Sequence, residues 1–249
     1  DNRISSNFGH HQMVHVTAAV ALDNEVESKE WIDFSLASHP PVEGKTGSGD
    51  IYMTLVNKVD RDGFGNEAAA AYNVGWLSSM MELANILSGY DKYPDADLYQ
   101  NPKFIKMMDS IINTICVSQF IPNIGDNSIM GKGYTAYPLS VLLKIYEITG
   151  NENIARLAYL TNNESTEGLY GDIFSEEPEK IVADIKRIIQ EDEALSLGSI
   201  NLAGYGMAGR AGERADHSAT PSLKQCGGWR PAPDRQARGA RITLAQFLP

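Results

Sequence analysis

Cysteine is scarce in this chain of 249 residues, which contains only Cys116 and Cys226. Two cysteines are too few for a disulfide framework. Long apolar runs are also lacking, because no stretch approaches the ~18 residues of a membrane-spanning helix, and no signal peptide is visible. We therefore expect no membrane insertion. The first residue is Asp1 rather than methionine, so we expect a chain that was processed or cut out of a longer one.

Basic charge is in deficit, with 21 Lys and Arg against 32 Asp and Glu and a net charge of −11. This balance argues against a nucleic-acid partner. The charge is unevenly distributed, since residues 209–249 carry +4 and residues 1–208 carry −15. The basic tail also loses the apolar periodicity of the preceding chain. Two interpretations stand: a disordered, solvated tail, or a disturbance of the coding frame between about residues 209 and 241.

Hydrophobic residues, at 43% of the chain, are ample for a core. Apolar residues recur at helical spacing in segments 10–22, 50–59, 68–87, 103–117, 139–148, 154–160 and 181–189. Gly150 is placed to end one helix, and Pro178 with Glu179 to begin another. From about residue 195 the sequence becomes glycine-rich and strand-like. We therefore predict a mainly α fold, an incomplete α/α toroid over residues 1–194, followed by the start of an antiparallel β-sandwich over residues 195–249.

Three of the five histidines lie close together near the amino end of the chain. His11 and His15 are four residues apart and would share a helix face, as in two-histidine metal sites, but no third ligand follows at a recognisable spacing. A structural role at the start of the helix is the second interpretation. The third is a polar catalytic cluster of Asn7, His10, His11 and Gln12, where the helix dipole favours an anionic ligand.

A second polar cluster lies in the segment VDRDGFGNEAAAAYNVGW. Its aspartates and glycines predict a turn, and a helix is expected to begin at Asn66 or Glu67. The twelve-residue calcium loop with a closing glutamate is not satisfied. Tyr72, five residues after Glu67, is either a core aromatic or a functional phenol.

Taken together, these segments resemble the heparinase II/III-like polysaccharide lyases. The resemblance is carried by an N-x-G-x-H-Q helix start and by DG-x-x-x-E-x(4)-Y-N about sixty residues later. IPNIGDNS is similar to a loop of the same family, and LAGYGMAGRAG is similar to the entry into its β-domain. The four motifs occur in the family's order and cover most of residues 1–212.

The resemblance implies β-elimination on a uronic-acid-containing glycan. Removal of the C5 proton places negative charge on the neighbouring carboxylate, which the site must stabilise. Asn7 and His11 are the matching residues, with His10 as a competing assignment for His11. Tyr72 would act as base at C5, as acid at the departing O4, or as both. The contacts with substrate implied by the resemblance involve His10, Gln12, Glu67, Asp126 and Tyr205.

No cofactor is implied for the reaction. Some family members carry a structural zinc bound through a G-G-H-G-H segment, but here Gly227 and Gly228 are followed by Trp229, and Arg230 and Ala232 stand where the histidines are expected. The partner implied is an acidic polysaccharide or oligosaccharide, and the substrate class implies a secreted or periplasmic location. Two alternatives stay open: a glycoside hydrolase on the same toroid, using carboxylates such as Asp62, Glu67 and Asp126, and a catalytically inactive carbohydrate-binding fragment.

Overall fold

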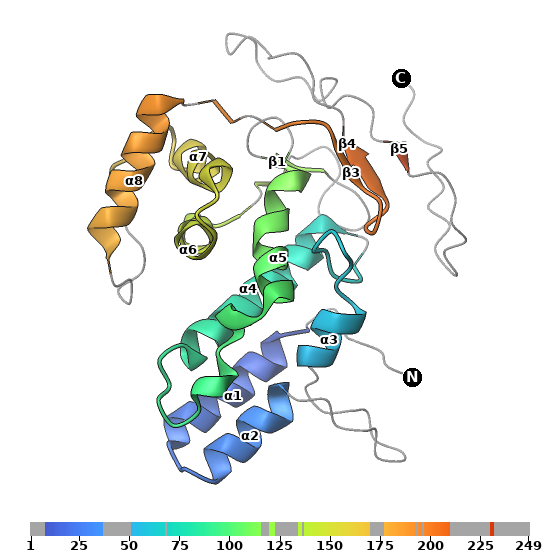
Figure 1. Ribbon diagram of the computed structural model, residues 1–249, viewed down its shortest axis with the longest axis vertical. Coiled ribbons are helices and arrows are strands. Elements are labelled where there is room, and N and C mark those ends of the chain that lie inside the picture. The colour runs from blue at the N-terminus through green and yellow to red at the C-terminus, as the bar shows by residue number, and fades with distance from the viewer. Residues whose placement is uncertain are drawn as a thin grey trace.

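The computed structural model describes residues 8–36, 51–67, 69–115, 120–122, 134–135, 137–169, 177–192, 194–195, 197–209 and 230–231 (Figure 1). This part of the chain is mostly helical, with two small antiparallel sheets. Its α-helices are α1 (His10–Leu22), α2 (Glu27–Leu36), α3 (Ile51–Asn57), α4 (Ala70–Leu87), α5 (Pro102–Ser110), α6 (Leu139–Thr149), α7 (Glu152–Thr161) and α8 (Pro178–Glu191). Three 3₁₀ helices are η1 (Pro94–Ala96), η2 (Leu98–Gln100) and η3 (Ile111–Thr114).

Helix α4 lies at the centre of the core. Its buried side chains recur at intervals of three and four, from Asn73 through Trp76 and Met80 to Leu87. The hairpin of α1 and α2 packs against it through α1 (Figure 1). Because α4 is apolar on most of its circumference, it is stable only when other helices surround it.

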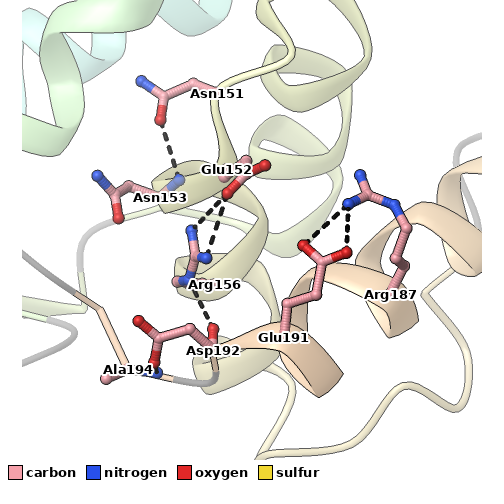
Figure 2. Close-up of polar contacts among 8 residues, drawn as sticks. All are labelled: Asn151, Glu152, Asn153, Arg156, Arg187, Glu191, Asp192 and Ala194. Carbon is pink, nitrogen blue, oxygen red and sulfur yellow. Dashed lines mark hydrogen bonds and ion pairs between the residues drawn. The ribbon is translucent and has the colours of Figure 1, made fainter.

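The remaining helices pack in chain order, with α5 against α6, α6 against α7 and α7 against α8 (Figure 1). Arg156 joins α7 to the end of α8, since its Nε donates to the main-chain oxygen of Asp192 at 2.8 Å and both terminal nitrogens reach Glu152 at 3.2 Å (Figure 2). Buried isoleucines at positions 181, 185 and 188 give α8 a single apolar face.

The strands are short. β1 (Phe120–Ile121) pairs with β2 (Tyr134–Thr135), and β3 (Ile200–Leu202) pairs with β4 (Met207–Gly209), which also pairs with β5 (Arg230–Pro231). All three pairings are antiparallel. The strand-like texture predicted after residue 195 is thus present in β3 and β4, and the coarse prediction of a mainly helical fold with antiparallel strands is confirmed for the described residues.

Several predicted boundaries agree with the structure and others need correction. The segment 10–22 is α1, Gly150 ends α6 with a φ of 64°, and Pro178 begins α8. Helix α2 was not predicted, because two of its four buried residues are Ser28 and Ser35 rather than apolar side chains.

Two helix ends were predicted wrongly. α4 begins at Ala70 instead of residue 66 or 67, and the carbonyl of Glu67 accepts a hydrogen bond from the Asn73 side chain. The helix predicted over 103–117 is α-helical only to Ser110 and continues as η3. The hydroxyls of Ser110 and Thr114 each donate to a carbonyl three residues earlier, which competes with α-helical bonding.

Candidate functional site

The loop before α4 is closed by the carboxylate of Asp60. One of its oxygens accepts from the main-chain N–H of Asp62 at 2.7 Å and from that of Phe64 at 3.1 Å. The Asp60 N–H in turn donates to the Phe64 carbonyl at 2.8 Å. Burial raises the pKa of Asp60, although these main-chain donors oppose the rise. The predicted turn is therefore present and is built on an Asx-type pattern.

Two glycines let this loop lie directly on α5 and α4. A Cβ at Gly63, whose φ is +95°, would be 2.7 Å from the Ser110 hydroxyl. A Cβ at Gly65 would be 2.7 Å from both Asn73 Oδ1 and Trp76 Cε3. Only glycine allows this approach, so both glycines of the segment hold the loop against the helices.

Asp62 connects the loop to the turn between β3 and β4. Its Oδ2 accepts from the N–H of Gly204 at 2.5 Å and lies 3.4 Å from the N of Tyr205. The ring of Tyr205 stacks on Phe64, with centroids 4.5 Å apart and planes 21° apart. The helical part and the first strands are thus joined by a charge-assisted hydrogen bond and an aromatic stack.

Asn73 completes the connection from the side of α4. Its Nδ2 donates to the carbonyl of Glu67 at 2.9 Å and to the phenol oxygen of Tyr205 at 3.3 Å. The residue is 6% exposed, and its Oδ1 has no hydrogen-bond partner within the described residues. The two hydrogen bonds from its amide nitrogen therefore hold this buried polar side chain in place.

A small cavity lies beside Asn73, with room for about one water molecule. Its lining residues are Gly63, Phe64, Asn73, Val74, Leu77, Met107, Ser110, Ile111 and Tyr137. Burial raises the pKa of Tyr137 far above its ordinary value. The cavity is too small and too apolar to hold a sugar, so any substrate must bind outside it.

Tyr72 lies in the first turn of α4, directly before Asn73, and is partly buried. Its main-chain N–H donates to the carbonyl of Ala69 at 3.1 Å. The residue that the sequence proposed as the reacting phenol is therefore at the end of the helix where the loop and the β3–β4 turn meet.

The start of α1 packs on the same helix. The ring of Phe8 lies 5.1 Å from that of Trp76, one turn after Tyr72. Gly9, with a φ of +91°, approaches α4 so closely that a Cβ there would be 3.0 Å from the Cβ of Ser79. The Gly9 N–H donates to Gln12 Oε1 at 3.0 Å, so Gln12 caps the helix.

The histidines of α1 separate into two groups. His10 and His11 are exposed at the start of the helix, with ring centroids 6.2 Å apart. His15 lies against α2, where its Nδ1 is 2.8 Å from the hydroxyl of Ser35 and its ring stacks on Trp31 at 5.3 Å. This arrangement favours the structural interpretation for His15 and leaves His10 and His11 accessible.

The structure brings Glu67 and Tyr205 together at Asn73, the residue after Tyr72. The start of α1, with His10, His11 and Gln12, packs further along α4. Asn7 and Asp126 lie outside the described residues. Sequence reasoning missed Asn73, although a signal was present: an asparagine stands at a position whose neighbours at helical spacing, Trp76 and Met80, are buried.

No family model matches the chain, and neither the curated proteins nor the solved structures give a match. Over the described ranges, no group of three or more His, Cys, Asp or Glu side chains is arranged to hold a metal ion. No helix in that same part of the chain has the length and apolar character required to cross a bilayer.

Proposed function

We propose that this chain is part of a polysaccharide lyase that cleaves a uronic-acid-containing glycan by β-elimination. The observation that carries the proposal is the convergence on α4 of three segments distant in sequence. These are the start of α1 (residues 8–12), the loop of residues 60–67, and the turn of residues 203–206. Each contains part of one of the motifs by which the sequence resembles heparinase II/III-like lyases.

The same reasoning extends to the architecture. Helices that contact their neighbours in chain order, as α5 to α8 do, are what an incomplete α/α toroid requires. The strands β3 and β4 follow these helices, as expected for the beginning of a sandwich domain. We propose that residues 1–194 are the toroid and that residues 195–249 begin the β-domain.

Elimination needs a group that neutralises the uronate carboxylate and a group that removes the C5 proton. The exposed start of α1 is suited to the first task, since the helix dipole favours an anion there. His10 or His11, with Asn7, would complete this site. Because the residues 1–208 carry −15, local donors of this kind are required to hold a polyanionic substrate.

Tyr72 is the proposed proton-transfer residue. A phenol with its ordinary pKa near ~10 is protonated at neutral pH, so removal of the C5 proton requires phenolate stabilised by nearby donors. Tyr205 is less suited to this task, because burial raises its pKa to about 12 despite the donor from Asn73. The two tyrosines therefore receive different roles: Tyr72 transfers the proton, and Tyr205 stays protonated.

One of the carboxylates proposed for hydrolysis, Asp62, is less available than the sequence indicated. Asp62 accepts hydrogen bonds from the backbone of residues 204 and 205. A carboxylate engaged in this way is poorly placed to exchange protons with a substrate.

The substrate class, an acidic glycan, also implies a secreted or periplasmic location.

The proposal is tested by ultraviolet absorbance of the unsaturated uronyl product over a panel of acidic polysaccharides. Wild type should produce the signal and Tyr72→Phe should not. Tyr90→Phe is the matched control, because Tyr90 follows the opposite end of α4 and its hydroxyl lies 3.4 Å from Asp23. New reducing ends without the absorbance would overturn elimination in favour of hydrolysis. Saturable binding with neither signal would assign the chain to carbohydrate binding alone.

A further inference from the structure

The N-cap residue of α4 is Ala69, whose methyl side chain makes no capping hydrogen bond. A helix start without a capping side chain frays readily. The equilibrium between its helical and frayed states is typically about fivefold less favourable to the helix than that of a capped start. Tyr72 lies within this first turn, so its position depends on whatever else holds the turn in place.

The Asn73 side chain ties this turn to the neighbouring segments. Its Nδ2 donates to the carbonyl of Glu67, six residues earlier, and also to the phenol oxygen of Tyr205. The amide is thus anchored at two points, one on the preceding loop and one on the β3–β4 turn. Because Asn73 is buried, both bonds are shielded from competing water.

Tyr205 can serve as an anchor only if its own position is fixed. The main chain at residues 204 and 205 is held by the Asp62 carboxylate, and the Tyr205 ring is held against Phe64. Gly204 permits this approach, since a Cβ there would be 2.9 Å from Asp62 Oδ2. The phenol oxygen is therefore aimed at α4 by contacts with the loop that precedes the helix.

We infer that Asp62, Asn73 and Tyr205 form a positioning network that fixes the first turn of α4 and thereby orients Tyr72. This inference rests on the proposed function for its catalytic consequence, whereas its structural claim does not. It assigns Asp62 as a hydrogen-bond acceptor and Tyr205 as an anchor, instead of a catalytic carboxylate and a substrate contact. A misplacement of about 1 Å of a reacting group can reduce a rate by about a hundredfold, so the network would affect kcat more than KM.

The structural claim is tested by hydrogen exchange of the amides of residues 69–73. Tyr205→Phe keeps the ring on Phe64 but removes the oxygen that accepts from Asn73, so exchange in this segment should become about fivefold faster, as for the loss of one hydrogen bond. Tyr99→Phe is the matched control, because it also removes a tyrosine–asparagine bond, from Tyr99 to Asn85 at 2.5 Å. Unchanged exchange in Tyr205→Phe would overturn the inference, whether or not the chain proves to be a lyase.

Asp62 provides a second pair of variants. Asp62→Asn keeps an oxygen that can accept from Gly204, so exchange should stay close to wild type, while Asp62→Ala should resemble Tyr205→Phe. Equal deprotection by both substitutions would contradict the role of Asp62 as an acceptor. If Asp62→Asn kept its protection but lost all turnover, Asp62 would also be a catalytic carboxylate, and its assignment to positioning alone would be overturned.

The catalytic consequence is tested by the kinetics of the same variants on the substrate identified for wild type. Tyr205→Phe and Asp62→Ala should lower kcat by about tenfold and leave KM within about twofold, which is the pattern of a misplaced reacting group. A rise in KM alone would show that Tyr205 contacts substrate, and would overturn its assignment as an anchor. If wild type shows no elimination, the proposed function fails while the exchange measurement still decides the network.

Discussion

The side-chain amide of Asn73 donates to the phenol oxygen of Tyr205 at 3.3 Å, across 132 positions of sequence. This single bond connects the first turn of the central helix to the turn between β3 and β4. It places a buried polar residue directly beside Tyr72, the residue proposed to transfer the proton. The geometry at this junction, rather than any one motif, is what makes the segment a candidate site.

Substitution of Gly63 by alanine should destabilise the fold by about 3 kcal/mol, from left-handed backbone strain together with overpacking. The new Cβ would lie 2.6 Å from the carbonyl of Lys106 and 2.7 Å from the hydroxyl of Ser110. Gly89→Ala is the control, since Gly89 has a φ of +81° but no neighbouring atom within 4 Å of a Cβ. The Gly89→Ala variant should lose only the free energy of the backbone strain, about 1 kcal/mol. Urea denaturation measures both, and equal losses would show that the loop does not press on α5.

Arg156→Ala should lower the free energy of unfolding by about 2 kcal/mol, because the residue is only 9% exposed and its Nε holds the end of α8. Arg187→Ala is the matched control. Arg187 pairs with Glu191 at 3.0 Å (Figure 2). Both side chains are more than half exposed, so the loss on substitution of Arg187 should stay within about 0.5 kcal/mol. Chemical denaturation distinguishes the two, and similar losses would contradict the role of Arg156 as a link between α7 and α8.

Asn151→Ala should cost about 1–2 kcal/mol, since Asn151 is the N-cap of α7 and accepts from the N–H of Asn153 at 3.0 Å. Its Nδ2 also donates to Asp109 of α5 at 2.6 Å. Asn151→Ser keeps a capping oxygen but cannot reach Asp109, so its loss should be smaller than that of the alanine variant. Thermal denaturation of the three proteins separates the cap from the bridge, and equal losses for both variants would assign the whole effect to the bridge.

Stability should fall as the pH rises from about 10 to 12, in part because of Tyr205. Burial raises the pKa of this phenol to about 12, so the folded state retains a proton that the unfolded chain, with a pKa near ~10, releases. The contribution of Tyr205 to stability is fully present below the pKa of the unfolded chain. It is lost as the pH rises through the pKa of the folded state. Tyr205→Phe should flatten the pH dependence of the unfolding free energy in this window. An unchanged slope would show that Tyr205 titrates as an exposed phenol.

The sequence predicted those features that depend on neighbouring residues. The spacing of apolar residues placed α1, and Gly150 and Pro178 marked the end of α6 and the start of α8, because capping and φ preferences act within one turn. The second helix escaped prediction because Ser28 and Ser35 occupy its buried face. Ser28 is satisfied there by donating to the carbonyl of Ala19 on α1 at 2.6 Å, a partner that only the packed hairpin supplies.

The candidate site was predictable in its parts but not in its connections. The sequence singled out Tyr72, Glu67 and Tyr205, and the structure places these residues around the start of α4. It did not indicate Asn73 as a link, nor that Asp62 accepts from Gly204 142 residues later. Local spacing carries no information about contacts of this separation, since they form only when the loop, the helix and the strands have packed.

By itself, then, the sequence determined the helical character of most of the described residues, the change to strands after residue 195, and the residue types available for acid–base chemistry. These follow from periodicity, turn residues and composition, which act over short stretches of chain. The tertiary structure alone decided which of these residues have partners: it assigned Asp62 to the backbone of the β3–β4 turn, His15 to Ser35, and Asn73 to Tyr205. Burial and hydrogen bonding between distant segments made those assignments, because a buried polar group is stable only where the fold supplies its partner.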